Sequence, residues 1–268
     1  MPELELPDVR LHYTQEGAGP ALTLLHGFTQ SLDSWRELMD QLPPAWRIVR
    51  LDLRGHGRSR TAAGAPHTLE ACAADVEELW RHLGITRSHL AGYSMGGRLA
   101  LHIAATRPGR LLSLVTIGAH AGLPPAERRR RRVEDIRLAA EIEAEGIEAF
   151  VDRWSRRALF AGQSRRGPEF EAALRAQRLA NEPEGLAAAL RGMGAAEMEP
   201  LWRRLHLVGC PALFIAGAED SAYAKHAQRL AAAVPKGTAL LVEGAGHAAH
   251  LEQPQAVATA LAAHLSRR

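Results

Sequence analysis

The sequence contains only two cysteines, Cys72 and Cys210, among its 268 residues. Two thiols cannot form a disulfide framework, and we expect both to be small, buried, apolar side chains. The chain also lacks any run near the roughly 18 consecutive apolar residues of a membrane-spanning helix. Residues 1–5 are acidic, without the basic start and apolar core of a secretory signal. These absences predict a cytoplasmic protein without stable membrane insertion.

Signatures of metal and phosphate binding are missing as well. The sequence has no His-Glu-x-x-His motif and no paired cysteine spacing, so we predict no metal site. The glycine-rich segment Asp52–Ser59 lacks the Gly-Lys-Ser/Thr ending of a phosphate-binding loop, and we expect it to brace its surroundings. No residue pattern points to an organic cofactor, and none is predicted.

The composition is that of a globular protein, with 46% hydrophobic and 24% charged residues. A chain of this length is expected to form one large α/β domain, with or without an inserted subdomain. The net charge of +3 mildly favours anionic partners, but basic residues gather at Arg128–Arg132. We interpret that run as a solvated helix face and predict no nucleic-acid partner.

Short apolar runs alternate with amphipathic helical patterns, which is typical of a parallel sheet covered by helices. Strands are expected at Ala21–Leu25, Arg47–Leu51, Ser88–Ala91, Leu112–Ile117, Ala212–Ala216 and Ala239–Val242. Helices are expected at Leu69–Leu83, Met95–Thr106, Ala222–Ala233 and Gln255–Leu265. The pattern predicts a mostly parallel, doubly wound α/β sheet.

The alternation stops between His120 and Leu205, where Ala, Glu, Arg and Leu dominate and β-branched runs vanish. We expect a helical insertion above the carboxyl ends of the strands, where open α/β sheets bind ligands. The predicted organisation is a core domain of residues 1–119 and 206–268, with a helical cap, or lid, at 120–205.

A Gly-x-Ser-x-Gly motif, Gly92-Tyr93-Ser94-Met95-Gly96, joins a predicted strand to a predicted helix. A serine on such a sharp turn needs small flanking residues, because larger ones would collide with neighbouring backbone. The turn exposes the hydroxyl above the sheet. We therefore predict that Ser94 is the catalytic serine.

A nucleophilic serine needs a base and an acid that orients the base. His247 follows a predicted strand within a Gly-x-Gly-His turn, which favours it as the base over His250. Asp220 follows the strand before it and is favoured as the acid over the adjacent Glu219. The chain order Ser, Asp, His is that of the α/β-hydrolase triad.

An oxyanion hole is expected from two backbone N–H groups. One is that of Met95, directly after the serine. The other is that of Phe28, in the loop Leu25-His26-Gly27-Phe28 after an early strand. We expect His26 to brace this loop.

Together these residues resemble the α/β-hydrolase superfamily over nearly the whole chain. Within it, segments 92–98 and 246–254 are similar to the 2-succinyl-6-hydroxy-2,4-cyclohexadiene-1-carboxylate synthases of menaquinone biosynthesis. The cap carries further similarity to that family. The segments concerned are Glu127-Arg128 through Asp135, Phe150–Trp154, Arg178–Asn181, Gly185–Ala187 and Leu190–Gly194.

The resemblance implies a lyase on a hydrolase scaffold, which abstracts a proton from an anionic cyclohexene and eliminates pyruvate without consuming water. Ser94, activated by His247 and Asp220, would act as the base. The family's substrate carries several carboxylates, and its arginine positions match Arg98, Arg178 and, within the arginine run, Arg131.

Two aromatic residues, Tyr93 and Trp154, match family positions that line the pocket, although either could equally be apolar packing. The chain also departs from the family. Ser221-Ala222-Tyr223 follows the acid where lysine and phenylalanine are more common, and Ala248 follows the histidine where asparagine or threonine is common.

Two other function classes stay open. A carboxylesterase or carbon–carbon bond hydrolase would use the same serine and histidine, but it would need an apolar acyl pocket. Burying unpaired arginines such as Arg98 and Arg178 beside a neutral ester would be costly. A non-catalytic ligand receptor on the same fold is a more remote alternative. The sequence does not fix the oligomeric state.

Overall fold

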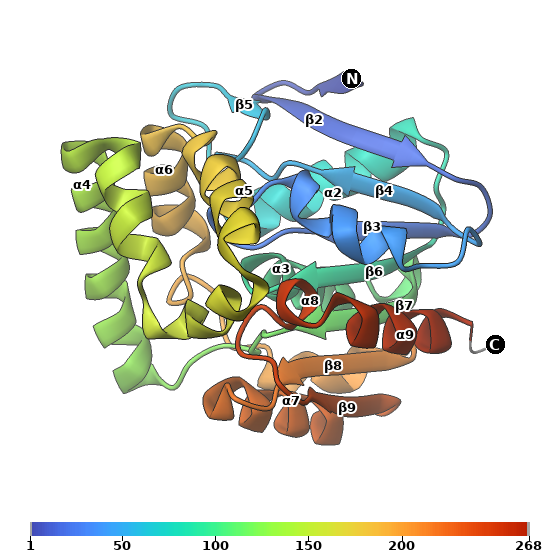
Figure 1. Ribbon diagram of the computed structural model, residues 1–268. Helices are drawn as coiled ribbons and strands as arrows, with labels where there is room; N and C mark the ends of the chain where they lie inside the picture. Colours follow the sequence, from blue (N-terminus) through green and yellow to red (C-terminus); the bar gives the residue numbers. More distant parts are fainter. Residues whose placement is uncertain (1, 267–268) are drawn as a thin grey trace.

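The fold is built on one mostly parallel sheet, seen in a computed structural model that describes residues 2–266 (Figure 1). The strand order is β1-β2-β4-β3-β6-β7-β8-β9, with β5 paired to β2. The strands are β1 (Glu3–Glu5), β2 (Val9–Glu16), β3 (Ala21–Leu25), β4 (Arg47–Leu51), β5 (Arg60–Thr61), β6 (Ser88–Tyr93), β7 (Leu111–Ile117), β8 (Ala212–Gly217) and β9 (Gly237–Val242). All neighbours from β4 through β9 run parallel.

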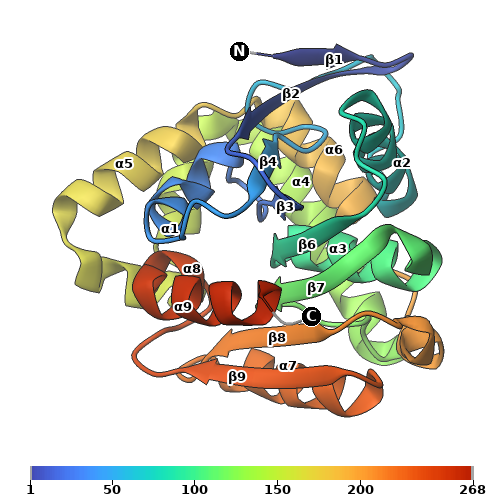
Figure 2. The same cartoon turned by 90° about the vertical axis from the view of Figure 1, so that its right-hand side faces the viewer.

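The six predicted strands are confirmed to within two residues at each end. Sequence reasoning missed β1, β2 and β5, which pair antiparallel at one edge of the sheet. Figure 2 shows β1 and β2 at this edge and β9 at the opposite one. In β2, apolar Val9, Leu11 and Tyr13 alternate with polar residues, so a strand signal was present in the sequence and was overlooked.

Helices cover both faces of the sheet, which confirms the doubly wound prediction. The helices are α1 (Arg36–Asp40), α2 (Leu69–His82), α3 (Met95–Thr106), α7 (Ser221–Ala233), α8 (Ala249–Glu252) and α9 (Pro254–Leu265). One apolar core joins α2, α3 and α7 to one face, and a second joins α1, α8 and α9 to the other. Successive strand residues serve opposite cores, as with Phe214 in the first and Ile215 in the second.

The segment between β7 and β8 is helical. Its elements are α4 (Pro125–Ser155), the 3-10 segment η3 (Ala158–Arg166), α5 (Pro168–Leu179), α6 (Pro183–Met193) and η4 (Trp202–Leu207). Gly146 has a φ of +80° and breaks α4 into two arms. In Figure 1 the arrowheads of the parallel strands point toward the side where α4, α5 and α6 lie. The helical content agrees with the sequence, and the cap boundaries at 120 and 205 stay predictions.

The helical segment has its own apolar cluster, separate from the two sheet cores. It includes Ile142 and Phe150 from the two arms of α4, and Leu186 from α6. Both cysteines are buried and free, as predicted. Within residues 2–266, no helix combines the length and apolar character needed to cross a bilayer.

Candidate active site

The turn at Ser94 is strained and depends on the glycines around it. Ser94 lies between β6 and α3 with a φ of +50°, a region that side chains other than glycine rarely adopt. A Cβ at Gly92 would lie 2.2 Å from the carbonyl oxygen of Gly96. A Cβ at Gly96 would lie 2.2 Å from that of Leu25. Only glycine at both positions lets the turn close and present the serine at the end of the strand.

The structure brings the three residues of the predicted triad together from three strand ends. The Ser94 hydroxyl lies 3.0 Å from Nε2 of His247, in the loop after β9. Nδ1 of His247 lies 2.9 Å from Oδ2 of Asp220, which follows β8. The imidazole is buried, whereas Ser94 and Asp220 are half-buried. This is the geometry of a relay in which histidine takes a proton from serine and aspartate fixes the tautomer.

Neither rival residue takes part in this relay. Glu219 is half-exposed, and its carboxylate pairs with Arg165 at 2.8 Å. His250 is buried between the rings of Trp35 and Tyr93, with centroid distances of 4.7 and 4.4 Å. Its burial lowers the pKa to about 3, so the ring is neutral at physiological pH.

Sequence reasoning missed Glu252, whose side chain is only 1% exposed. Its Oε2 accepts a hydrogen bond from the Gly246 amide at 2.7 Å, and its Oε1 accepts one from the Ala248 amide at 3.1 Å. These are the two peptide groups that flank His247. The sequence did offer a signal, because Glu252 lies in the family-like segment 246–254. No role had been assigned to this residue.

The predicted oxyanion donors border the same space as Ser94. Phe28 and Met95 both line the cavity at the serine. Within residues 2–266, neither amide donates to a protein acceptor. Such amides are available to an oxygen that gains negative charge during a reaction.

The loop that carries Phe28 is braced as expected. Nδ1 of His26 donates to the Gly27 carbonyl at 2.8 Å, and its Nε2 accepts from the Leu53 amide at 3.0 Å. The buried carboxylate of Asp52 accepts from the amides of Leu32 at 2.7 Å and Arg58 at 2.8 Å. The glycine-rich segment after β4 therefore supports this loop in the way predicted.

A cavity of about 100 Å³, called the inner cavity below, opens over Ser94 between the sheet and the helical segment. It is lined by Phe28, Tyr93, Ser94, Met95, Arg98, Arg131, Trp154, Arg157, Leu159, Phe160, Ala189, Leu190, Met193, Gly194, Ala195, Tyr223 and His247. Three of these side chains are arginines. The cavity therefore combines the proton relay with cations that suit an anionic ligand.

Arg98 is a buried cation without a carboxylate partner. Its Nη1 donates to the carbonyl oxygens of Met193 at 2.8 Å and Gly194 at 2.9 Å. Within residues 2–266, no acidic side chain lies within ion-pair distance of it. Burial lowers its pKa to about 10, which leaves it charged at neutral pH.

Arg131 is the member of the arginine run that lines the inner cavity. Its Nε donates to the buried carboxylate of Asp135 at 2.8 Å. Arg128 and Arg132 instead pair with Glu199 and Glu197 on the segment after α6. These ion pairs support the interpretation of the run as a helix face, while the prediction that no nucleic acid binds stays untested.

Arg178 lies outside the inner cavity. It lines a neighbouring cavity of about 370 Å³, and Phe160 borders both cavities. The Arg178 guanidinium lies over the Phe160 ring at 5.0 Å and donates to Ser155 and Gln163. Its role as a substrate anchor stays a prediction from the resemblance.

Two further residues of the inner cavity were missed. Tyr223 stacks near His247, with ring centroids 4.4 Å apart. Arg157 lies over the Trp154 ring, 4.6 Å from its centroid. A spacing of three residues on a helix predicts that Trp154 and Arg157 share a face, but not that the face borders the serine. Among residues 2–266, no group of three His, Cys, Asp or Glu side chains could hold a metal ion.

Comparison with known proteins finds one matching family and similar proteins of known name. The family described as alpha/beta hydrolase fold matches residues 20–254. The chain is 36% identical to a Bacillus subtilis (strain 168) protein provisionally named 2-succinyl-6-hydroxy-2,4-cyclohexadiene-1-carboxylate synthase, over 92% of this chain and 91% of that one. It is 32% identical to the Klebsiella pneumoniae (strain ATCC 700721 / MGH 78578) protein of that name, over 91% and 92%.

Solved structures agree with the sequence relatives. MenH from S. aureus matches with a TM-score of 0.89 at 26% identity, covering 97% of this chain and 98% of that one. The enol-lactonase from Burkholderia xenovorans LB400 matches with a TM-score of 0.84, also at 26% identity, covering 99% and 100%. The same scaffold is therefore found in proteins with different reactions, and the residues at the site have to decide between them.

Proposed function

Because the chain belongs to the α/β-hydrolase fold family and, within it, to the 2-succinyl-6-hydroxy-2,4-cyclohexadiene-1-carboxylate synthases, we propose that it is a carbon–oxygen lyase of menaquinone biosynthesis. Its substrate is 2-succinyl-5-enolpyruvyl-6-hydroxy-3-cyclohexene-1-carboxylate, a small polycarboxylate. The observation that carries the proposal is Arg98, a buried cation without a carboxylate partner in the cavity that holds Ser94. An anionic substrate would provide the missing negative charge.

The names of substrate and product define the bonds that change. A 3-ene becomes a 2,4-diene, so a proton leaves C2 and the enolpyruvyl oxygen leaves C5. The electron pair of the C2–H bond forms the C2–C3 double bond, and the former C3–C4 double bond moves to C4–C5. The C5–O bond breaks, and protonation of the departing enolate yields pyruvate. No water enters the reaction.

The relay at Ser94 supplies the base. The serine oxygen, 3.0 Å from Nε2 of His247, takes the C2 proton as its own proton passes to the imidazole. Asp220, 2.9 Å from Nδ1, stabilises the resulting imidazolium. The imidazolium can then return its proton to the departing enolate. Ser94 acts here as a base and forms no acyl intermediate.

The oxyanion donors stabilise the charge that develops when C2 loses its proton. C2 carries the succinyl group, whose carbonyl oxygen becomes an enolate oxygen. The amides of Phe28 and Met95 border the cavity and have no protein acceptor within residues 2–266, so they are available to that oxygen. Removing one such donor from an oxyanion hole typically costs about 10²- to 10³-fold in rate.

The arginines of the site hold the carboxylates of the substrate. We assign Arg98 and Arg131 to substrate binding in the inner cavity and keep Arg178 as an anchor that borders it through Phe160. Tyr93 and Trp154 form part of the wall. The cytoplasmic location and the absence of a nucleic-acid partner remain predictions from the sequence.

Pyruvate release from freshly generated substrate tests the function, with lactate dehydrogenase and NADH as the reporter. A short-chain nitrophenyl ester is assayed in parallel. Fast pyruvate release with poor ester cleavage is the expected result. Ester cleavage without pyruvate release would make the protein a carboxylesterase or carbon–carbon bond hydrolase, and failure of both assays with intact ligand binding would favour a receptor.

A further inference from the structure

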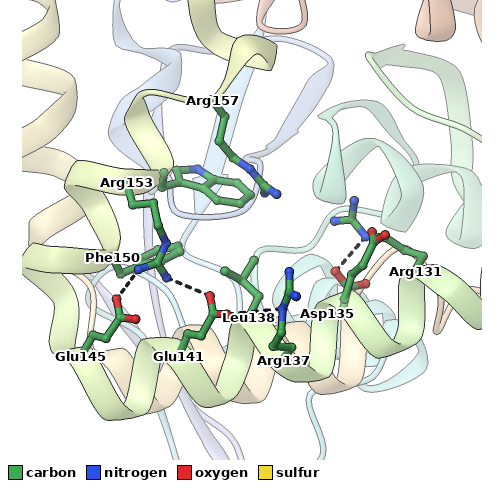
Figure 3. A pocket seen from close by; sticks show the side chains of 11 residues that line it. Arg131, Asp135, Arg137, Leu138, Glu141, Glu145, Phe150, Arg153 and Arg157 are labelled. Atoms are coloured by element: carbon green, nitrogen blue, oxygen red, sulfur yellow. Dashed lines mark hydrogen bonds and ion pairs between the residues drawn. The ribbon is translucent and has the colours of Figure 1, made fainter.

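A third cavity, besides the inner one and the one lined by Arg178, borders the inner cavity and has no role in the proposed reaction. This outer cavity, of about 580 Å³, lies between the two arms of α4 (Figure 3). Arg131, Trp154 and Arg157 line both cavities. These three side chains therefore form the junction through which the two spaces meet.

The arginines of the outer cavity differ in whether a carboxylate neutralises them. Arg137 pairs with Glu141 at 3.4 Å, and Arg153 pairs with Glu141 at 3.0 Å. Arg131 pairs with Asp135 at 2.8 Å. Within residues 2–266, Arg157 alone among these arginines has no ion pair and no hydrogen bond to a side chain. The junction thus contains one arginine without an ion-pair partner, and the nearby carboxylates Glu134 and Asp135 offset its charge only from a longer distance.

The position of Arg157 suits contact with a ligand. Figure 3 shows its side chain reaching from the segment after α4 toward the cavity, opposite the side chains that rise from the first arm. Its guanidinium lies over the Trp154 ring at 4.6 Å, which holds the planar group in place while its edge N–H groups stay free. Partial burial, followed by the nearby Arg131, lowers its pKa despite the opposing effect of Glu134 and Asp135, so an added anion would relieve an unfavourable environment.

The size of the inner cavity supplies the second argument. It measures about 100 Å³, whereas cavities that enclose small-molecule ligands are usually about 300–1,000 Å³. The proposed substrate has a ring, a succinyl arm and three carboxylates. Its reacting ring can approach Ser94 only if other parts extend past the junction. The outer cavity provides that room. Leu138 and Phe150 form its apolar wall, beside four arginines and four carboxylates, Glu134, Asp135, Glu141 and Glu145.

We propose that the outer cavity forms the second half of the substrate site, and that Arg157 binds a substrate carboxylate distant from the reacting carbon. The inference rests on the proposed function, since it takes a cyclohexene polycarboxylate as the ligand. It adds a fourth arginine to those that the family resemblance implies. It also assigns the cap a role in binding the part of the substrate that does not react.

The experiment compares Arg157→Gln, which removes the charge and keeps most of the length, with Arg157→Lys, which keeps the charge. The matched control is Arg129→Gln, because Arg129 is exposed on the same helical segment and lines neither cavity. For pyruvate release we expect Arg157→Gln to raise KM about tenfold, the loss of one charge-assisted contact, with kcat changed less than twofold. On a logarithmic scale, the KM of Arg157→Lys should lie at least halfway back from the KM of Arg157→Gln to that of the unmodified protein. The control should keep the KM of the unmodified protein.

A second measurement does not depend on turnover. Binding of propane-1,2,3-tricarboxylate is followed by tryptophan fluorescence, and Arg157→Gln should weaken it about tenfold while Arg129→Gln leaves it unchanged. If the unmodified protein releases no pyruvate, the proposed function fails, and the tricarboxylate titration still decides the role of Arg157. Any of three results would overturn the inference. All variants could bind the tricarboxylate with equal affinity, Arg157→Gln and Arg129→Gln could lose affinity equally, or Arg157→Lys could fail to restore the KM.

Discussion

The carboxylate of Glu252 holds the backbone on both sides of His247. It accepts from the Gly246 amide at 2.7 Å and from the Ala248 amide at 3.1 Å, and it is almost completely buried. By accepting two hydrogen bonds, one carboxylate fixes the loop that presents the imidazole to Ser94. A group that touches no substrate can therefore determine where the proton relay lies.

Replacing Glu252 by glutamine should disturb this arrangement with little change in volume. The amide NH₂ cannot accept a hydrogen bond, so one of the two peptide N–H groups loses its partner and His247 shifts. Because a displacement of about 1 Å can cost about 10²-fold in rate, we expect kcat for pyruvate release to fall about 100-fold at a nearly constant KM. Steady-state kinetics would separate the two constants.

The control for this prediction is Glu243→Gln, since Glu243 is exposed in the same loop. It should leave kcat unchanged. A Glu252→Gln protein with normal kcat, or one in which KM alone rises, would show that the loop holds His247 without the carboxylate.

Ser94→Ala should remove the base without unfolding the protein. The alanine keeps the Cβ that the turn already accommodates at a φ of +50°. General-base catalysis contributes about 10²- to 10⁴-fold, so kcat for pyruvate release should fall by about 10³-fold. Circular dichroism should remain that of the unmodified protein. A variant that retains a tenth of the rate would assign the base to another residue.

Arg98→Lys tests whether the planar guanidinium is needed as well as the charge. Lysine cannot donate to the Met193 and Gly194 carbonyls and offer a second pair of N–H groups to a carboxylate at the same time. We expect KM to rise by about tenfold or more, because a charge-assisted, two-point contact becomes a single one. The midpoint of thermal unfolding distinguishes this effect from loss of fold. An unchanged KM would place Arg98 in the structural framework alone.

The sequence predicted the triad because parallel strands place their carboxyl ends at one edge of the sheet. Ser94, Asp220 and His247 each follow a strand that the apolar pattern located, so their meeting follows from topology. The preference for His247 over His250 came from the glycine turn before it. The structure supports that choice by placing the imidazole of His250 among aromatic rings.

The substrate side of the site was less predictable because it is formed by packing between helices of the cap. Arg178 lies beyond Phe160, in a neighbouring cavity, and Arg157 reaches the junction through its contact with Trp154. Neither placement follows from local periodicity, which gives the face of a helix but not its neighbour. The edge strands β1 and β5 were missed for a different reason. They contain only three and two residues, which is too short for an alternating pattern to be recognised.

His250 should make the protein sensitive to acid. Both of its ring nitrogens are buried without a hydrogen-bond partner within residues 2–266, and burial lowers its pKa to about 3. In the unfolded chain an imidazole binds a proton below a pH of about 6.5. Between about pH 6.5 and pH 3 the unfolded state therefore holds one more proton at this residue than the folded state. The contribution to stability is constant above that window and is lost progressively as the pH falls through it.

His250→Leu removes this group and keeps an apolar side chain in the site between Trp35 and Tyr93. The slope of unfolding free energy against pH, measured by urea denaturation from pH 6.5 to pH 4.5, should decrease by about 0.7 kcal/mol per pH unit at pH 6.5 and by about 1.3 kcal/mol per pH unit near pH 5. His206→Leu is the matched control, because His206 is exposed, and it should leave the slope unchanged. Other buried histidines such as His56, whose pKa burial also lowers to about 3, should keep part of the slope in both variants. Parallel curves for His250→Leu and the unmodified protein would mean that His250 gains its proton without unfolding, through a partner or a water that enters beside the ring.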